Sequence, residues 1–276
     1  MKLLKGKGIA EKILAEVKKD VKNRRIKPGL AVVLVGNNPA SEIYVKLKAK
    51  AAKQVNIRFK LVRFKADTSE NKIVSAIKKL NADKRINGII VQLPLPQKFN
   101  KRKVISAIDP RKDVDGFHPI NLKKFLAGKI SVYPVFPLAI MKLLEASKVK
   151  LSDKKAVIIA NSKEFGLVMR QALKLRRIKA KYIFSKNLEK NFDLLKGSDI
   201  VVTAMGKPGL IRGNMLKKDV VVIDGGINKT GKRVLGDGDF ESVKSVASCL
   251  SPVPGGVGPV TIACLLKNVS NMARNI

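Results

Sequence analysis

A tyrosine, a lysine and a glutamine stand where they could line a ligand site. Tyr44 and Lys48 lie four residues apart on a predicted helix and would share one face. A phenol ring and an ammonium group on one face could bind a ligand, and surface decoration is the alternative. Gln92 ends an apolar run before Pro94 and Pro96, which stiffen the exit from a strand. α/β proteins bind ligands at such strand ends, and a rigid exit loop is the alternative.

Two further segments combine acidic residues, glycine and proline. Asp113 and Asp115 stand beside Gly116, where they could bind a metal ion or hydrogen-bond a heterocycle. An Asx turn explains Asp113 and Gly116 equally well. Residues 252–259 precede a predicted helix, and their glycines would let the backbone approach a ligand closely, with N–H groups near the helix N-terminus. A plain helix-entry loop would rarely need so much glycine and proline.

The elements that must position these residues alternate between strand and helix. Continuously apolar, β-branched runs predict buried parallel strands, and apolar residues at helical spacing predict helices. Strands are expected at 30–36, 57–64, 88–93, 156–160, 180–184, 199–203 and 219–224. Helices are expected at 40–55, 68–80, 137–147, 165–177 and 257–272. The alternation predicts an α/β fold with a mostly parallel sheet, in two units joined around 125–138.

Two of the predicted strands end in glycine-containing loops, at 200–209 and 220–228. Nucleotides bind at such edges of doubly wound sheets. The sequence has neither a Walker A motif nor a GxGxxG segment placed between a strand and a helix. The segment 236–238, Gly-Asp-Gly, is expected to form a turn.

The composition excludes several classes of protein. The 276 residues are 45% hydrophobic, which is too apolar for a disordered basic tail. No apolar run reaches the roughly 18 residues of a membrane span, and the first residues lack a secretion-signal pattern, so a cytoplasmic protein without a membrane partner is expected. Cys249 and Cys264 lack metal-site spacing and are expected to be buried thiols. With His118 as the single histidine, no metal site is expected.

The net charge of +36 comes from 57 Lys and Arg against 21 Asp and Glu, and it leaves three interpretations open. The basic residues are spread over both halves of the chain, many at helical spacing, which favours a solvated lysine-rich surface. Recognition of an anionic ligand is the second interpretation, and nucleic-acid binding is the third. Nucleic acid is least favoured because the three Tyr and ten Phe, mostly inside apolar runs, offer no base-stacking platform.

Taken together, the motifs resemble one family, the bifunctional methylenetetrahydrofolate dehydrogenase/methenyltetrahydrofolate cyclohydrolases. The resemblance runs nearly end to end and is carried by residues 35–50, GIIVQLPLP at 88–96, KDVDGFHP at 112–119, GKPG at 206–209, IDGGIN at 223–228 and PVPGGVGP at 252–259. It implies two α/β domains with the active site in the cleft between them. The folate-binding catalytic domain would span 1–136, completed by the C-terminal helix within 257–276. A Rossmann-like dinucleotide-binding domain would span 137–256.

The resemblance also implies a reaction and the residues that perform it. The reaction is oxidation of 5,10-methylenetetrahydrofolate with a nicotinamide cofactor, followed by hydrolysis of the methenyl product to 10-formyltetrahydrofolate. Lys48 matches the catalytic lysine that assists proton transfer and water attack, and Gln92 matches the residue that tunes it. Tyr44 matches the aromatic ring that stacks on the folate, and Asp115 matches the carboxylate that binds the pterin N–H groups. The loop residues that would flank the folate are Pro254, Gly258 and Pro259.

On the cofactor side, the resemblance implies NADP, with NAD as an alternative, and a homodimer. The residues expected to bind the cofactor are Ala160, Asn161, Ser162, Ser185, Gly206 and Ile227. The family's Gly-Arg-Ser or Gly-Ala-Ser is here Ala-Asn-Ser at 160–162. The position that often binds the 2′-phosphate falls on Ile183, where Lys181 and Lys186 could substitute. The family's Pro-Cys-Thr-Pro-x-Gly segment is Pro-Val-Phe-Pro-Leu-Ala at 134–139.

These departures leave two alternatives open. The first is a cyclohydrolase whose dehydrogenase activity is weak or lost, suggested by Ala160, Leu138 and Ala139. The second, of another class, is a basic nucleic-acid-binding protein that uses the same scaffold without catalysis. The joint presence of the four folate-site residues argues against the second, because a binding scaffold would not need all four.

Overall fold

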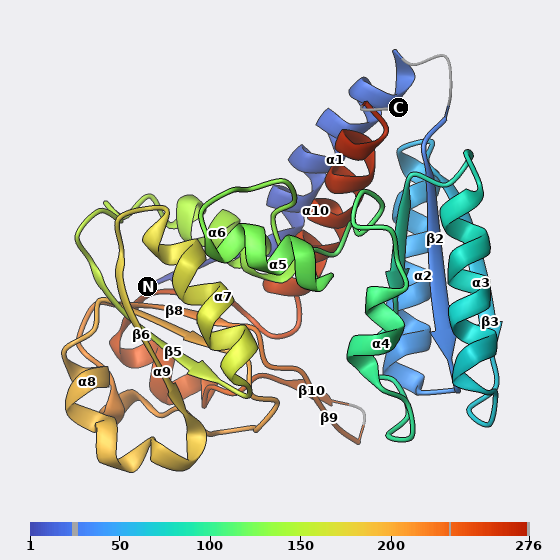
Figure 1. Ribbon diagram of the computed structural model, residues 1–276. Helices are drawn as coiled ribbons and strands as arrows, with labels where there is room; N and C mark the ends of the chain where they lie inside the picture. Colours follow the sequence, from blue (N-terminus) through green and yellow to red (C-terminus); the bar gives the residue numbers. More distant parts are fainter. Residues whose placement is uncertain (24–26, 232, 275–276) are drawn as a thin grey trace. The chain divides into compact units, whose positions relative to one another are not determined.

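The computed structural model describes residues 1–23, 27–231 and 233–274, and the chain divides into two compact units (Figure 1). The N-terminal unit comprises Glu11–Val135 and Ile262–Ile276. The C-terminal unit comprises Met1–Ala10 and Phe136–Thr261. Each unit is built on a parallel sheet with helices, so the predicted two-part α/β class is confirmed.

The N-terminal unit contains a three-stranded parallel sheet in the order β3-β2-β4. The strands are β2 (Gly29–Val35), β3 (Arg58–Phe64) and β4 (Gly88–Val91). Every residue of the central strand β2 is buried, which explains its continuous apolar sequence. Alternate side chains of β2 pack with α3 (Glu70–Ala82) and α4 (Lys101–Ser106) in one apolar core.

The remaining helices of this unit carry or support the candidate site. Helix α2 (Pro39–Gln54) connects β2 to β3, and α5 (Pro119–Leu126) follows the KDVDGFHP segment. Helices α1 (Gly6–Lys22) and α10 (Val257–Met272) each contribute residues to both units. Within the N-terminal unit, an ion pair joins the two helices, with Lys267 Nζ 3.2 Å from a carboxylate oxygen of Glu16.

The C-terminal unit contains a six-stranded parallel sheet in the order β1-β11-β8-β7-β5-β6. The strands are β1 (Lys2–Leu3), β5 (Lys155–Ala160), β6 (Lys179–Phe184), β7 (Ile200–Thr203), β8 (Val220–Asp224) and β11 (Ala247–Leu250). The α-helices are α6 (Val135–Ser147), α7 (Lys163–Lys174), α8 (Phe192–Lys196) and α9 (Phe240–Val246). Short 3₁₀ turns form at Ser185–Asn187, Glu189–Asn191 and Gly213–Met215, and β9 (Asn228–Thr230) pairs with β10 (Arg233–Leu235) as a hairpin.

The strand order of this sheet reverses beside β5. The chain passes from β5 to its neighbour β6, and then crosses to β7 on the other side of β5. Such a switch point is where doubly wound sheets bind dinucleotides, outside the carboxyl ends of the strands. The C-terminal unit therefore has the topology of a nucleotide-binding domain.

All seven predicted strands and all five predicted helices are present, with ends shifted by a few residues. Strand β1 differs from the expected organisation, because it pairs with β11 and the first ten residues group with the C-terminal unit. The expected boundary places them with the N-terminal domain. A strand of only two residues carries too little local signal to be predicted, and the residues that β1 pairs with lie more than 240 positions away in sequence.

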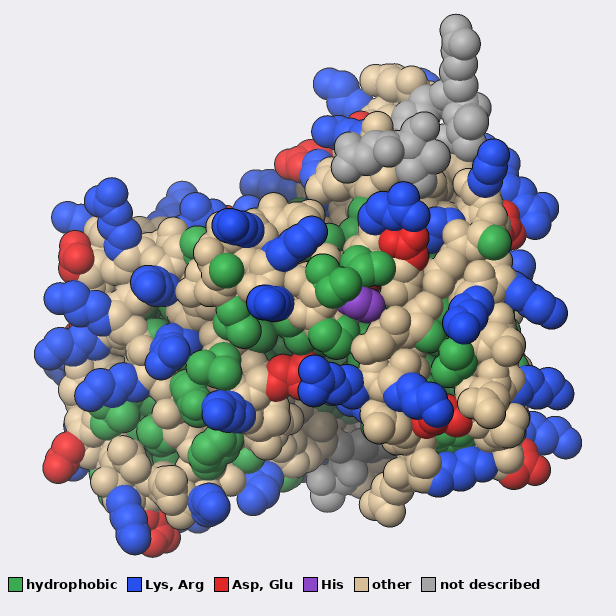
Figure 2. Space-filling model, in the orientation of Figure 1, with side chains coloured by type: hydrophobic (Ala, Val, Ile, Leu, Met, Phe, Trp, Pro, Cys, Tyr) green, Lys and Arg blue, Asp and Glu red, His purple; other side chains and the backbone are tan. Residues whose placement is uncertain are grey.

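Basic side chains are scattered over the face shown in Figure 2, rather than gathered in one stripe. Cys249 and Cys264 are both buried and are not joined in a disulfide, as expected. Among the described residues, no helix is long and apolar enough to cross a membrane.

Candidate active site

The most direct contact among the predicted residues joins Lys48 to Gln92. Helix α2 begins at Pro39, and the Asn38 side chain caps it by accepting a hydrogen bond from the Ser41 N–H. Two turns beyond Ser41, Lys48 Nζ donates a hydrogen bond to Gln92 Oε1 over 2.7 Å. Burial lowers the pKa of the Lys48 ammonium, although the negative charge of Asp115 acts in the opposite direction.

Gln92 is held in place by its own backbone and by the chain that follows it. Its N–H donates to Val33 O over 2.8 Å, which extends the β2–β4 pairing by one residue. Its Nε2 donates to Leu93 O over 2.7 Å, and that carbonyl also accepts from Ser41 Oγ. Because the amide nitrogen is engaged in this way, the amide oxygen is directed to Lys48.

The two aspartates have different environments. The Asp113 carboxylate is buried and accepts hydrogen bonds from the N–H groups of Gly116, Phe117 and His118 and from Asn121 Nδ2. Asp113 therefore orders the loop as an Asx-type turn, which confirms the structural interpretation of this residue. Among the described residues, no three potential metal-ligating side chains gather anywhere in the chain.

Asp115 is electrostatically coupled to the lysine. Burial raises the pKa of the Asp115 carboxyl to about 6, while the positive charge of Lys48 lowers it. Each of the two charges shifts the pKa of the other group toward its charged form. The Asp115 backbone is fixed by the Val135 N–H, which donates to Asp115 O over 3.1 Å.

Tyr44 lies one turn before Lys48 on α2, so the two side chains share a helix face as predicted. The ring is half-buried, and burial raises the pKa of the phenol, which keeps it protonated near neutral pH. The N-terminal unit thus brings an aromatic ring, an amine, an amide and a carboxyl to one region.

The other predicted folate-flanking residues belong to the C-terminal unit. Pro254 is exposed and follows a cis peptide bond with Val253. Gly255 has a φ of +101°, which favours glycine, and its carbonyl accepts a hydrogen bond from the Gly6 N–H. Gly258 and Pro259 lie in the first turn of α10.

All six residues expected to bind the cofactor lie at one edge of the C-terminal sheet. They lie at or just beyond the carboxyl ends of β5, β6, β7 and β8, which the register places at the same level. Ser162 caps α7, its Oγ accepting from the Phe165 N–H over 3.2 Å. Ser185 follows β6, Gly206 follows β7 with a φ of +71°, and Ile227 follows β8 with 45% of its surface exposed.

This edge fits a dinucleotide. Asn161 and Ser162 are exposed at the N-terminus of α7, where backbone N–H groups and the helix dipole favour phosphate. Ile183, in contrast, is buried in the core with Val157 and Val201. Its apolar side chain offers no donor for a 2′-phosphate, which is the departure from the family pattern that the sequence shows at this position. The half-exposed residue just beyond the same strand is Ser185.

Sequence reasoning missed Asp237. Its two glycine neighbours predict a simple turn at 236–238, yet the Asp237 side chain is fully buried. Its carboxylate accepts from Thr203 Oγ1, from the Met205 N–H and from the Lys207 N–H, each over 2.7 Å. Asp237 thereby fixes the loop that carries Gly206. An aspartate between two glycines is a common turn signal, and nothing local distinguishes this one.

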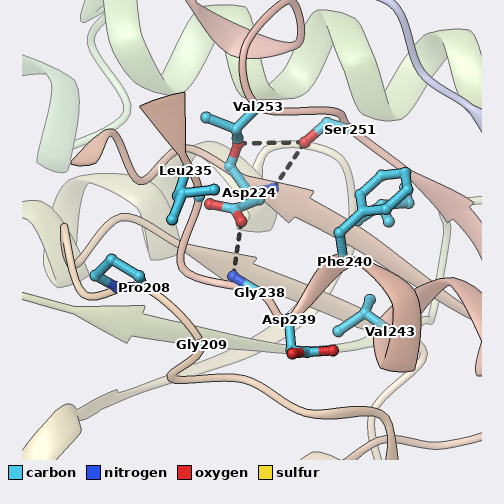
Figure 3. Close-up of a pocket in the computed structure, with 12 residues that line it drawn as sticks. Pro208, Gly209, Asp224, Leu235, Gly238, Asp239, Phe240, Val243, Ser251 and Val253 are labelled. Atoms are coloured by element: carbon cyan, nitrogen blue, oxygen red, sulfur yellow. Dashed lines mark hydrogen bonds between the residues drawn. The ribbon is translucent and has the colours of Figure 1, made fainter. Parts of the chain in front are cut away.

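A pocket of about 210 Å³ lies at the β8–β11 side of the same unit (Figure 3). Asp224 lines it, and its carboxylate accepts from the N–H groups of Gly226 and Gly238. Burial raises the pKa of Asp224 to about 6. Among the described residues that line the pocket, none is one of the six expected to bind cofactor.

Comparisons with known proteins agree with this architecture. Residues 4–115 match the family model "Tetrahydrofolate dehydrogenase/cyclohydrolase, catalytic domain", and residues 134–276 match the "NAD(P)-binding domain" of the same family. The chain is 44% identical to the bifunctional protein FolD of Moorella thermoacetica, covering 99% of this chain and 98% of that protein.

Solved structures show the same relationship. The bifunctional enzyme FolD from Campylobacter jejuni superimposes with a TM-score of 0.94 at 40% identity, covering 100% of this chain and 99% of that chain. The Trypanosoma brucei enzyme, solved with NADP and an inhibitor, has a TM-score of 0.94 at 32% identity, covering 99% and 97%. The fold and the site define a two-domain, nicotinamide-dependent α/β enzyme. The chain belongs to the tetrahydrofolate dehydrogenase/cyclohydrolase family.

Proposed function

We propose that the chain oxidises 5,10-methylenetetrahydrofolate with NADP⁺ or NAD⁺, and then hydrolyses the methenyl product to 10-formyltetrahydrofolate. Family membership along the whole chain supports both activities of this bifunctional enzyme of one-carbon metabolism. The observation that carries the residue assignment is the 2.7 Å hydrogen bond from Lys48 to Gln92, beside a carboxyl coupled to the same lysine.

Lys48 and Gln92 are suited to the hydrolytic step. A lysine whose pKa is lowered by burial can hold a free amine closer to neutral pH, and so can accept a proton. Water attacks the methenyl carbon as the Lys48 amine takes its proton. The C–N5 bond then breaks, the carbon becomes a formyl group on N10, and N5 receives the proton held by Lys48. The second water proton is released to solvent.

Gln92, Asp115 and Tyr44 act by orientation. The Gln92 amide oxygen accepts from the Lys48 amine and so fixes its direction. An ionised Asp115 accepts hydrogen bonds from the N–H groups of the pterin, and the Tyr44 ring offers a face on which the pterin stacks. By the family resemblance, Pro254, Gly258 and Pro259 would flank the folate.

The C-terminal unit would hold the dinucleotide at the carboxyl edge of its sheet. In this proposal Ser162 and the α7 N-terminus would bind the phosphates, and Ser185 would bind the ribose beside β6. Gly206 and Ile227 would line the path across β7 and β8. When bound, the oxidised nicotinamide would supply the oxidising power by accepting a hydride, that is a proton with two electrons, from the one-carbon bridge.

One assay tests the assignment. Purified protein receives methylenetetrahydrofolate with NADP⁺ or NAD⁺, while reduced cofactor and methenyl absorbance are followed separately. Formation of reduced cofactor and decay of added methenyltetrahydrofolate support both activities. Rapid methenyl hydrolysis without reduced cofactor would leave only the cyclohydrolase, and absence of both would refute the proposal.

By family resemblance, we place the enzyme in the cytoplasm as a homodimer. Two buried cysteines that form no disulfide suit a reducing compartment. Light scattering on the purified protein tests the assembly, with twice the mass of the 30.2 kDa chain expected. A mass of one chain at micromolar concentration would contradict the dimer.

A further inference from the structure

Phe136 packs directly on a glycine at the carboxyl edge of the C-terminal sheet. Gly225 follows β8, and its N–H donates to Thr203 O over 2.8 Å, so it lies beside the end of β7. A Cβ at position 225 would lie only 2.7 Å from Phe136 Cζ, a separation that Cβ atoms do not show in real structures. The aromatic ring therefore occupies the space that a side chain at 225 would need.

A second ring extends this surface. The centroids of Phe136 and Phe165 are 5.7 Å apart, with the ring planes tilted by 50°. Phe165 lies in the first turn of α7, where its N–H is held by Ser162 Oγ. Both phenylalanines are half-buried, so each keeps part of its surface exposed. An aromatic pair thus lies among Ser162, Gly225 and the end of β7.

The sheet topology indicates which half of a dinucleotide this pair would meet. In a doubly wound sheet the dinucleotide crosses the switch point, with its adenosine half over the first two strands of the domain. Here those strands are β5 and β6, so the nicotinamide half falls over β7 and β8. Gly225, directly after β8, lies on that side.

We propose that the exposed surface of Phe136, supported by Gly225 and Phe165, is the wall against which the nicotinamide ring binds, and that it favours the oxidised ring. The inference rests on the proposed dehydrogenase function. An aromatic face attracts a cation through its quadrupole, and the oxidised nicotinamide is a pyridinium cation whereas the reduced ring is neutral. Phe136 stands where the family segment has Thr, so this wall is a feature of the present chain.

The absence of tryptophan from the chain allows a direct spectroscopic test. In Phe136→Trp, the single indole should be quenched saturably by NADP⁺, because a pyridinium stacked on indole withdraws its excited electron. Phe192→Trp is the control. Phe192 begins α8, which leads to the amino end of β7, away from the carboxyl edge. Its fluorescence should not change at the same cofactor concentrations.

Phe136→Leu removes the ring and retains an apolar side chain. Equilibrium dialysis should show the Kd for NADP⁺ raised about three- to tenfold, and the Kd for NADPH raised less than about twofold. Retained NADPH binding shows that the nucleotide unit has folded. Gly225→Ala, which displaces the ring, should likewise raise the Kd for NADP⁺ more than the Kd for NADPH.

Each result has a defined meaning. If the wild-type protein binds neither NADP nor NAD in either oxidation state, the proposed dehydrogenase function fails. If the wild type binds NADP⁺ but the indole of Phe136→Trp is not quenched, or if Phe136→Leu changes both affinities equally, the aromatic-wall inference fails while the function stands.

Discussion

Replacement of Asp237 by asparagine tests how the cofactor side of the enzyme is built. The wild-type carboxylate is fully buried, with Oδ2 accepting from Thr203 Oγ1 and the Met205 N–H, and Oδ1 accepting from the Lys207 N–H. Asparagine has one oxygen. At the position of Oδ2, this oxygen can accept from both Thr203 Oγ1 and the Met205 N–H. The amide nitrogen of the asparagine then faces the Lys207 N–H, so that two hydrogen-bond donors oppose each other.

The cost follows from these contacts. A hydrogen bond to a charged group contributes about 1.5–3 kcal/mol, so loss of the Lys207 contact should cost about 2 kcal/mol. The two remaining hydrogen bonds would have a neutral acceptor and would be weaker, which adds roughly 1 kcal/mol in total to the loss of stability. A loss of about 3 kcal/mol should lower the thermal midpoint by roughly 6–12 °C for a unit of this size. The loop carrying Gly206 should also loosen, raising the Kd for the dinucleotide.

Thermal unfolding by circular dichroism measures the first effect, and equilibrium dialysis with NADP⁺ measures the second. The matched control is Asp239→Asn, two residues away. Asp239 is exposed and caps α9 by accepting from the Ser242 N–H, a role that asparagine also fills. The control should unfold within about 2 °C of the wild type. If Asp237→Asn also unfolds within about 2 °C, the argument from its buried hydrogen bonds is refuted.

Four further predictions concern the folate side and the charge. Lys48→Met should reduce the rate of methenyl hydrolysis about 100-fold or more, and full activity of this variant would contradict the assignment. Gln92→Glu should raise the pKa of Lys48 and so shift the rising limb of the hydrolysis pH profile to higher pH. Because the pKa of Asp115 is about 6, its carboxylate becomes protonated below that pH and no longer accepts hydrogen bonds from the pterin N–H groups. The kcat/KM for the folate should therefore fall about tenfold per pH unit below pH 6. The kcat/KM of Asp115→Asn should be low and independent of pH over that range, and a sloping profile in the variant would assign the titration to another group. Near pH 8 the variant should be at least as stable as wild type, because burial disfavours the ionised carboxyl. Finally, folate and dinucleotide are anions and the chain carries +36, so kcat/KM should fall as salt rises, and a flat response would show that the lysines only solvate the surface.

Much of the folate site follows from local sequence. The i, i+4 spacing of Tyr44 and Lys48 places both on one face of α2, because a helix repeats every 3.6 residues. Gln92 follows an apolar run at a strand end, and the structure places it one residue beyond β4. What the spacing could not supply is the Lys48–Gln92 contact, which joins residues 44 positions apart and depends on how α2 packs beside the sheet.

At the cofactor site, the sequence predicted the edge of the sheet but not which side chains there are buried. Strand ends predicted the edge at which the six candidate residues gather, since parallel strands align their carboxyl ends. The burial of Ile183, however, does not follow from the strand repeat. Lys179 and Lys181 share the alternation of Ile183 and are exposed, so only the packing at the end of β6 decides that Ile183 is buried.

The sequence by itself determined the α/β class and the order of the principal strands and helices, because these depend on apolar periodicity and local turn signals. The residues expected to act on folate were implied by the resemblance of the motifs to one family. The tertiary structure alone decided that β1 pairs with β11, that Asp237 holds the loop of Gly206, and that Phe136 lies on Gly225. Each of these contacts joins residues at least 30 positions apart. Their energy comes from packing and hydrogen bonds formed only when the whole sheet is assembled, so no local pattern encodes them.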